Sequence, residues 1–327
     1  MSLRIGKTTL ATLAIAVAAG GAQAAAPTDV YPTKPIRFIV GFPPGGGNDT
    51  LARIFGLKIA DRLGQPVVID NRPGAGGNLA AALTAKSPAD GYTILMISST
   101  HPIQGLLKKN LPYDPIGDFS GIAQLVAYRT LIAVHPDVPA KSVRELIDLA
   151  KAKPGALNFV SSGNGTGSHL AGELFRVSAG VEMTHVPYKG TAQAITDLIA
   201  GRVQLMFTPL VPVIAHLKSG RLRAVAVTSG KRSRIMPELP TVAESGVPGY
   251  EFVSWYGIIG PAGLPARVKN TLNAAAGHAM DLADVKNKLL DDDMDLIKRT
   301  PEAFDGIRKA NLAKWTKIVK QTGITAQ

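Results

Sequence analysis

The chain has 327 residues, carries a formal net charge of +12 at pH 7 and is 46% hydrophobic, which suits about two globular domains with cores of their own. It contains no cysteine, which excludes disulfides, thiolate metal sites and thiol catalysis. The densest basic cluster, residues 231–234, is short, so no nucleic-acid partner is expected. The scattered positive charge fits a field that attracts small anions, or a surface that only maintains solubility.

The first 24 residues have the pattern of a secretory signal peptide. Arg4 and Lys7 precede an apolar stretch, residues 10–19, and the small residues Ala22 and Ala24, on either side of Gln23, fit a cleavage site. The apolar stretch is shorter than the roughly 20 residues that a membrane-spanning helix needs. We expect cleavage near Ala24 and export of the protein; an uncleaved interfacial anchor is the alternative.

Strand-like and helix-like segments alternate from Ile36 to about Val227. The strand-like runs are continuously apolar, as expected for strands that are covered on both faces of a sheet. Helical segments lie between them, and one of these opens with a capping box at Ser142 and Glu145. The alternation predicts an α/β fold with a mostly parallel sheet. The expected strands are residues 36–40, 67–69, 93–97, 131–134, 157–160, 203–207 and 222–227.

The pattern changes after Ile259, where no further strong strand is expected. Residues 265–280 and 301–320 are expected to be helices, and the second begins with Thr300 as its cap and Pro301 in its first turn. This helical tail must pack on structure that is already formed, and we expect it to return to the first domain.

Three glycine-rich turns, residues 41–49, 71–78 and 161–169, each join a strand-like run to a helix-like run. A helix start carries unpaired N–H groups and the positive end of the helix dipole, and glycine lets an anion approach them closely. Each turn is therefore a candidate anion site, or a plain connection without a ligand. The first and third combine several glycines with Asn, Ser or Thr, which favours a ligand site over a plain connection. Three such turns in one chain suggest a ligand with more than one anionic group, or one turn on each side of a cleft.

Common catalytic and metal-binding motifs are absent from the sequence, including the P-loop, the nucleophile elbow and the zinc-protease helix. Ser168 and His169 are neighbours at a helix start and point in different directions, so they do not form a catalytic pair. Ser168 is predicted to be a cap or ligand donor, and His169 to pack behind it. Residues 291–293 lack the spacing of a calcium loop. No metal or cofactor is expected.

Short motifs along nearly the whole mature chain resemble the receptors of tripartite tricarboxylate transporters, also called Bug receptors. Each motif is modest alone, but their number and order make the resemblance specific. They are YPTKPI at 31–36, FPPGGGND at 42–49, NRPGAGG at 71–77, PADGYT at 88–93, VPYKG at 186–190, KSGRLRA at 218–224 and PTVAESG at 240–246.

The resemblance implies a periplasmic solute-binding protein of the two-lobed, type II flytrap class, with a central sheet in each lobe and a helical C-terminal tail. It implies a first lobe of residues 25–126 plus 253–327 and a second lobe of residues 127–252, with hinges near 124–128 and 250–255. It implies no catalysis. The expected partners are a small organic acid and integral membrane transporter subunits, and the receptor is expected to be a monomer.

In the resembling family, the first glycine loop binds one carboxylate, mainly through backbone N–H groups, and the helix start after the third loop binds the far carboxylate. Carried onto this chain, the turn after residue 97 also lines the cleft. The ligand-binding residues implied in this way are Phe42, Pro43, Gly45, Gly46, Gly47, Asn48, Ser98, Ser99, Gly163, Asn164, Thr166, Gly167, Ser168 and His169.

The chain departs from the family pattern at Thr208, where members commonly have an aspartate that could receive an ammonium group. Threonine offers one hydrogen bond and no charge. We therefore expect Thr208 to contact the ligand, and the ligand to be a mono- or dicarboxylate, aromatic acids included, rather than an amino acid.

Two other functions remain open at this level. One is an exported α/β enzyme that acts on a carboxylate through Asp49 or His169, although Asp49 is better explained as an acidic residue at a helix start. The other is a receptor of the same fold that reports ligand to a membrane sensor.

Overall fold

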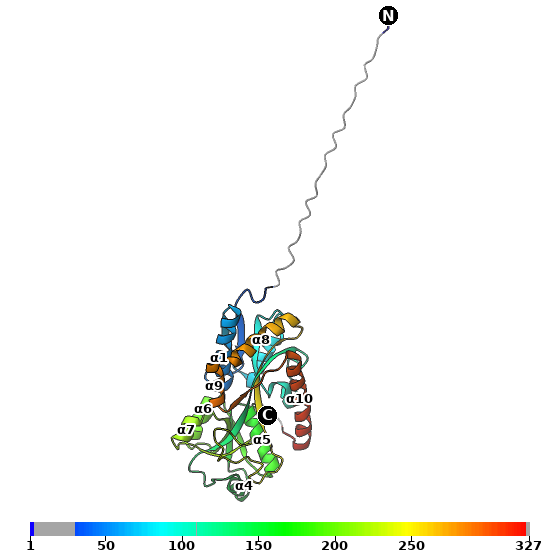
Figure 1. Ribbon diagram of the computed structural model, residues 1–327. Coiled ribbons are helices and arrows are strands. Elements are labelled where there is room, and N and C mark those ends of the chain that lie inside the picture. Colours follow the sequence, from blue (N-terminus) through cyan, green and yellow to red (C-terminus); the bar gives the residue numbers. More distant parts are fainter. Residues whose placement is uncertain (3–29, 109, 325–327) are drawn as a thin grey trace. The chain divides into compact units, whose positions relative to one another are not determined.

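The computed structural model describes residues 1–2, 30–108 and 110–324, so the predicted signal peptide lies outside the described residues except for its first two. From residue 31 onward the chain forms helices around a ten-stranded sheet (Figure 1). The strand order is β2-β1-β3-β9-β4-β7-β5-β6, and β8 and β10 pair with β4. The strands are β1 (Ile36–Val40), β2 (Val67–Asn71), β3 (Thr93–Ser98), β4 (Phe119–Val134), β5 (Asn158–Ser161), β6 (Thr184–Pro187), β7 (Leu205–Pro209), β8 (Arg223–Val227), β9 (Val253–Pro261) and β10 (Met294–Leu296).

The sheet has two halves, and β4 takes part in both. In the first half, β2, β1 and β3 are parallel, and β9 runs antiparallel to β3. In the second half, β6, β5 and β7 are parallel. Up to Arg129, β4 pairs with β9; from Thr130 onward it pairs with β7, and from Leu131 onward also with β8 on its other edge. The chain therefore crosses between the halves along β4 and returns as β9.

The predicted α/β fold is confirmed, with parallel strands in each half and antiparallel crossing strands. The strand expected at residues 131–134 is longer, because the polar residues Gln124, Arg129 and Thr130 within β4 hid its first part. No further strong strand was expected after Ile259, and the strand that begins there in the described part of the chain, β10, is only three residues long and pairs with β4. The lobe boundaries stay a prediction, although β4 changes partners within three residues of the predicted boundary at 126.

The helices cover both faces of the sheet and bury its apolar strands. In the first half, Phe38 of β1 and Phe55 of α1 belong to one core; in the second half, the rings of Phe159 on β5 and Phe175 on α5 both contact that of Phe207 on β7. The helices are α1 (Gly47–Leu63), α2 (Asn78–Ala85), α3 (Gln104–Leu107), α4 (Val143–Ala152), α5 (Gly167–Ala179), α6 (Thr191–Ile199), α7 (Ile214–Lys218), α8 (Ala266–Asp281), α9 (Ala283–Asp291) and α10 (Pro301–Thr322), with short 3₁₀ turns η1 (Ala75–Gly77) and η2 (His101–Ile103).

The C-terminal helix α10 packs on both halves, not only on the first (Figure 1). Near its start, the ring of Phe304 meets that of Trp255 edge to face at 5.3 Å, within the first half. Near its end, Trp315 meets Phe252 in the same way at 6.0 Å, and Ile324 joins the core of the second half. The expected return to the first domain is therefore only part of the packing of this helix.

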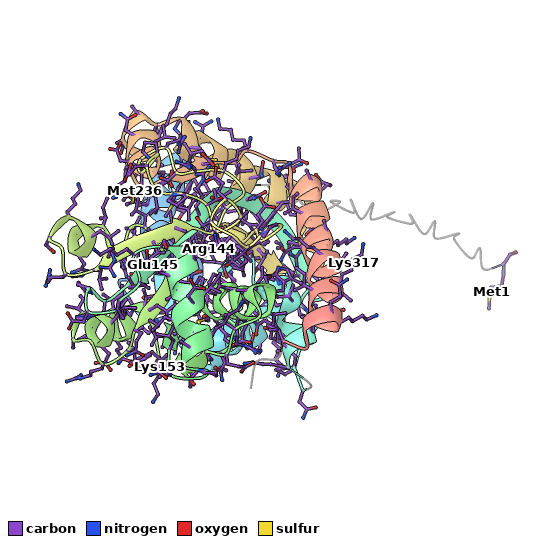
Figure 2. The ribbon with its side chains drawn as sticks, turned by 90° about the horizontal axis from the view of Figure 1, so that it is seen from below. Met1, Arg144, Glu145, Lys153, Met236 and Lys317 are labelled. Carbon is purple, nitrogen blue, oxygen red and sulfur yellow. The ribbon has the colours of Figure 1, made fainter. Side chains whose placement is uncertain are left out.

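Charged side chains project from the outer surfaces of α4 and α10, including Arg144, Glu145 and Lys317 (Figure 2). The buried face of α4 is apolar, as in other surface helices, whereas that of α10 also contains the buried Arg308, which donates to the carbonyl groups of Phe119 and Pro115. Among the helices of the described chain, none combines the length and the apolar composition that crossing a membrane requires.

Candidate ligand-binding site

The first glycine turn leads from Val40, the end of β1, into α1. Gly46 caps α1 in an extended conformation, and no side chain caps the helix start. The first N–H groups of a helix have no partner within the helix, and the positive end of its dipole lies there. Gly46, Gly47 and Asn48 line a pocket, so this uncapped start of α1 borders the space that a ligand would fill.

The buried carboxylate of Asp49 holds this turn in shape. It accepts hydrogen bonds from the Gly45 N–H at 2.9 Å, from Asn71 Nδ2 at 2.9 Å and from Arg53, and Asn71 also donates to the carbonyl of Phe42. Burial alone would raise the pKa of Asp49, but the hydrogen bonds from Arg53, Gly45 and Asn71 outweigh it and lower the pKa. This carboxylate is therefore committed to the loop, which argues against the enzymatic role considered for Asp49.

Position 47 favours glycine because the hydroxyl group of Tyr256 lies close to its backbone. A Cβ atom built on Gly47 would lie 2.7 Å from the hydroxyl oxygen of Tyr256, closer than real Cβ contacts. Tyr256 on β9 stacks on Tyr128 on β4, with ring centroids 4.6 Å apart and planes within 16°. Both rings line the pocket, so the crossing strands supply an aromatic wall beside the start of α1.

The third glycine turn leads from β5 into α5, whose cap residue is Thr166 and whose start also lacks a side-chain cap. Hydrogen bonds within the turn fix its backbone. Thr166 Oγ1 donates to the carbonyl of Gly163 at 2.7 Å, and the N–H of Ser162 donates to Ser168 Oγ at 3.1 Å. Thr166, Gly167 and Ser168 line the same pocket as the first turn.

Two stacked histidines support the third turn from behind. Nδ1 of His169 accepts the N–H of Gly165 at 3.1 Å, and the ring of His169 stacks on that of His185 at 4.1 Å. Nε2 of His185 lies 2.7 Å from Ser161 Oγ. The pKa of each histidine is lowered to about 4, mainly by burial, and in the case of His185 also by the neighbouring His169. Both rings are therefore neutral at physiological pH, and His169 supports the turn rather than acting as a base.

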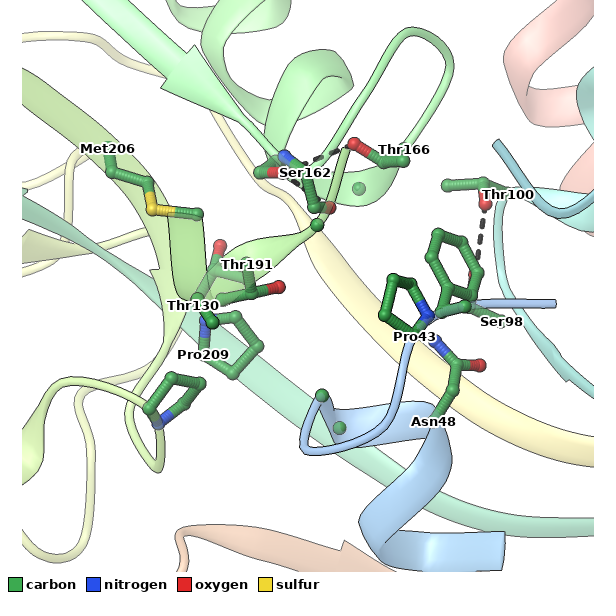
Figure 3. Close-up of a pocket in the computed structure, with 18 of the residues that line it drawn as sticks. Pro43, Asn48, Ser98, Thr100, Thr130, Ser162, Thr166, Thr191, Met206 and Pro209 are labelled. Carbon is green, nitrogen blue, oxygen red and sulfur yellow. Dashed lines mark hydrogen bonds between the residues drawn. The ribbon is translucent and has the colours of Figure 1, made fainter. Parts of the chain in front are cut away.

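A third helix start, that of α6, borders the same pocket. Gly190 precedes Thr191 at φ 144°, and again no side chain caps the helix. The cavity has a volume of about 250 Å³, and residues of the two halves face each other across it (Figure 3). It is lined by Phe42, Pro43, Pro44, Gly46, Gly47, Asn48, Ser98, Thr100, Tyr128, Thr130, Ser162, Thr166, Gly167, Ser168, Lys189, Gly190, Thr191, Ala192, Gln193, Met206, Pro209, Pro212 and Tyr256.

Most residues predicted from the sequence meet at this pocket. Those that line it are Phe42, Pro43, Gly46, Gly47, Asn48, Ser98, Thr166, Gly167 and Ser168. Those outside its lining are Gly45, Ser99, Gly163, Asn164, His169 and Thr208.

The residues outside the lining have structural contacts instead. Ser99 Oγ lies 2.6 Å from Ser254 Oγ in a buried pair. Thr208 is fully buried, and its hydroxyl donates to the carbonyl of Pro209 at 3.2 Å. Direct contact of these residues with a ligand stays a prediction.

Sequence reasoning missed two groups of lining residues. The first is the segment from Lys189 to Gln193 at the start of α6, where a strand, one glycine and a helix follow the same pattern as the turns that were considered. The second comprises side chains of the sheet and the residues that follow it. These are Tyr128, Thr130, Met206, Pro209, Pro212 and Tyr256.

The charge of the lining indicates what the pocket accepts. Among the described residues that line it, Lys189 is the only one with a charged side chain, and none is acidic. Oδ1 of Asn48 is buried without a hydrogen-bond partner among the described residues. Three uncapped helix starts and one lysine favour an anion, and the lack of carboxylates disfavours a ligand that carries an ammonium group.

Comparisons with known proteins agree with this chemistry. Residues 51–324 match the model of the tripartite tricarboxylate transporter family receptor. Protein BugT of Bordetella pertussis is 35% identical over 96% of this chain and 97% of its own. An R. palustris protein solved with adipate has a TM-score of 0.86 at 36% identity, covering 90% of this chain and 99% of its own. MatC from Rhodopseudomonas palustris, with bound malate, has a TM-score of 0.84 at 30% identity, covering 88% of this chain and 100% of its own.

Proposed function

This chain belongs to the tripartite tricarboxylate transporter receptor family of periplasmic solute-binding proteins, and we propose that it captures a small dicarboxylate in the pocket described above and delivers it to a membrane transporter. Receptors of this family bind solutes and are not enzymes, in agreement with the prediction of no catalysis.

The observation that carries the proposal is the convergence of three uncapped helix starts on one pocket. The starts of α1, α5 and α6 come from both halves of the sheet, so a ligand with an anionic group at each end would contact both. A ligand that contacts both halves favours the closed arrangement, since those contacts are complete only there. This differential binding would drive closure around the solute.

The proposed ligand class is a C4–C6 dicarboxylate without an ammonium group. Adipate and malate, bound by the two R. palustris proteins, have such a pair of carboxylates. The stacked rings of Tyr128 and Tyr256 offer an apolar surface for the carbon skeleton between the charges. The same surface would also suit an aromatic mono- or dicarboxylate, which is the alternative ligand class.

A thermal-shift screen of the mature protein tests the ligand class. The protein is first unfolded, dialysed and refolded, so that no copurified acid fills the pocket. Ligand that binds only the folded state raises the melting temperature by mass action. Succinate, malate, adipate, citrate, phthalate and benzoate are compared with glutamate, and calorimetry follows for the acids that shift. A shift with the dicarboxylates that lack an ammonium group, and none with glutamate, supports the proposal; no shift with any acid at millimolar concentration contradicts it.

Export and delivery need separate experiments. We propose that residues 1–24 direct export and that the mature protein is a monomer. N-terminal sequencing of the periplasmic protein should give a chain that begins after Ala24, and sedimentation should give a single protomer. Deletion of the gene should abolish uptake of the identified acid. Unchanged uptake with a lost transcriptional response would instead favour the sensory function.

A further inference from the structure

The second glycine turn, residues 71–78, supplies no residue to the ligand pocket. Four consecutive residues of this turn, Gly74, Ala75, Gly76 and Gly77, have positive φ angles, at 145°, 50°, 69° and 94°. This backbone conformation favours glycine, and it leaves the turn without side chains at three of the four positions. The second glycine turn packs against the residue that follows β1, since a Cβ atom on Gly41 would lie 2.8 Å from Gly77 Cα.

The second glycine turn contacts the third glycine turn, which belongs to the other half of the molecule. A Cβ atom built on Gly76 would lie 2.8 Å from the backbone oxygen of Asn164. Next to this contact, Nε2 of Gln104 in α3 donates to the backbone oxygen of Gly165 at 3.1 Å. Two successive carbonyl groups of the third turn therefore meet residues of the first half. Two residues further along, Gly167 lines the ligand pocket.

A buried chain of hydrogen bonds orients Gln104 for this contact. The hydroxyl of Tyr113 donates to Asn78 Oδ1 at 2.5 Å, and Asn78 Nδ2 donates to Gln104 Oε1 at 3.0 Å. Because Oε1 of Gln104 accepts from Asn78, its amide nitrogen is directed toward the carbonyl groups of Thr100 and Gly165. Gln104, Asn78 and Tyr113 are all at least 94% buried, so this orientation is fixed by the protein interior.

We propose that the second glycine turn, through Gly76, and the neighbouring Gln104 of α3 form a docking surface for closure, which positions the third glycine turn when the two halves come together. The proposal rests on the proposed function in that closure accompanies ligand capture. Neither residue contacts the ligand. They act by favouring the arrangement in which the start of α5 faces the start of α1, so the apparent affinity for any acid depends on them through the closed population.

The chain offers a matched control for a substitution at Gly76. Gly64, which ends α1, has φ 68°, almost the same as Gly76 at 69°, and nothing lies within 4 Å of a Cβ atom built on it. Gly76→Ala and Gly64→Ala therefore introduce the same backbone strain, and only the first places a methyl group against Asn164. Gln104→Glu is a second test, since it retains the acceptor for Asn78 and replaces the donor to Gly165 with an oxygen.

Adipate and malate serve as probes for binding by calorimetry. Gly76→Ala and Gln104→Glu should weaken binding about tenfold by lowering the closed population, whereas Gly64→Ala should bind like the wild type. Melting of the ligand-free Gly76→Ala and Gly64→Ala proteins should be lowered alike. Equal affinity of these two variants would overturn the proposal.

Closure is also measured without ligand, which separates this inference from the proposed function. Because the chain has no cysteine, Leu57→Cys on α1 and Lys153→Cys after α4 take spin labels selectively, and both positions are exposed. Pulsed dipolar spectroscopy should show a smaller short-distance population in Gly76→Ala than in Gly64→Ala. Identical distance distributions would refute the docking surface, whatever acid the receptor binds. Failure of the wild type to bind any acid would refute the proposed function alone.

Discussion

Gly47 and Tyr256 approach so closely that a methyl group on the glycine would lie 2.7 Å from the tyrosine hydroxyl oxygen. The same hypothetical Cβ atom lies 3.4 Å from Cζ of the ring, which is close to an ordinary van der Waals contact. The clash therefore depends on a single oxygen atom. It joins the start of α1, which borders the pocket, to the crossing strand β9.

Gly47→Ala should weaken ligand binding, and Tyr256→Phe should restore much of the loss. Overpacking of this kind costs about 1–3 kcal/mol, which corresponds to a loss of about 5-fold to 150-fold in affinity where the ligand-bound arrangement bears the cost. Calorimetry on the two single variants and the double variant measures the coupling between these positions. If the double variant binds as weakly as Gly47→Ala alone, the hydroxyl group is not what requires a glycine here.

Asp49→Asn should loosen the first glycine turn. The substitution removes a buried charge that accepts bonds from Arg53, Gly45 and Asn71, and hydrogen bonds to charged groups contribute about 1.5–3 kcal/mol each. Both the free energy of unfolding and the ligand affinity should fall at pH 7. Urea unfolding and calorimetry check this.

The pH dependence of that effect follows from the lowered pKa of Asp49. A carboxylate whose pKa is lower in the folded state contributes stability above its unfolded pKa, about 3.9, and loses it as the pH falls through the folded pKa. The difference in stability between wild type and Asp49→Asn should therefore be full at pH 7 and shrink below about pH 4. A difference that stays constant down to pH 2 would contradict the role of the charge.

The stacked histidines give a second pH dependence, in which protonation creates a buried charge, whereas protonation of Asp49 removes one. The folded pKa values of His169 and His185 are about 4, below the unfolded value of about 6.5, so the folded state binds fewer protons between these limits. Stability from this pair is full above about pH 6.5 and falls as the pH decreases toward 4. Removing one ring with His185→Phe should flatten the decrease in melting temperature between pH 7 and pH 5. Removal of the exposed His278 on α8, as His278→Gln, is the control.

Lys189 should act mainly on the rate of association. It is exposed and is the only charged side chain among the described residues of the pocket lining, so it attracts an incoming dianion without being desolvated. Lys189→Gln should slow association about threefold to tenfold and reduce its dependence on ionic strength, with dissociation little changed. Stopped-flow fluorescence measures both rates, and Lys189→Arg should retain the wild-type behaviour. A change confined to dissociation would place the ammonium group in direct contact with bound ligand instead.

The parts of this molecule that follow from local pattern could be predicted from the sequence. The strands β1, β2 and β5 with the glycine turns after them lie where apolar runs meet glycine, because those signals act within a few residues. The pairing of Tyr128 with Tyr256 could not be predicted, because it depends on the register between β4 and β9, which are far apart in the sequence. The start of α6 was missed because Gly190 is a single glycine, and only the fold brings it opposite Pro43.

The lack of carboxylates in the pocket lining predicts discrimination between glutarate and glutamate, which differ only by an ammonium group. Taking that group out of water without an opposing charge costs several kcal/mol, and Thr208, near the pocket lining on β7, is neutral and fully buried. We therefore expect glutamate to bind at least about a hundredfold more weakly than glutarate, which corresponds to about 2.7 kcal/mol. Calorimetry on this pair, and on aspartate against succinate, measures the difference directly. Equal affinities within either pair would show that an acceptor for the ammonium group exists in the pocket and that the ligand class includes amino acids.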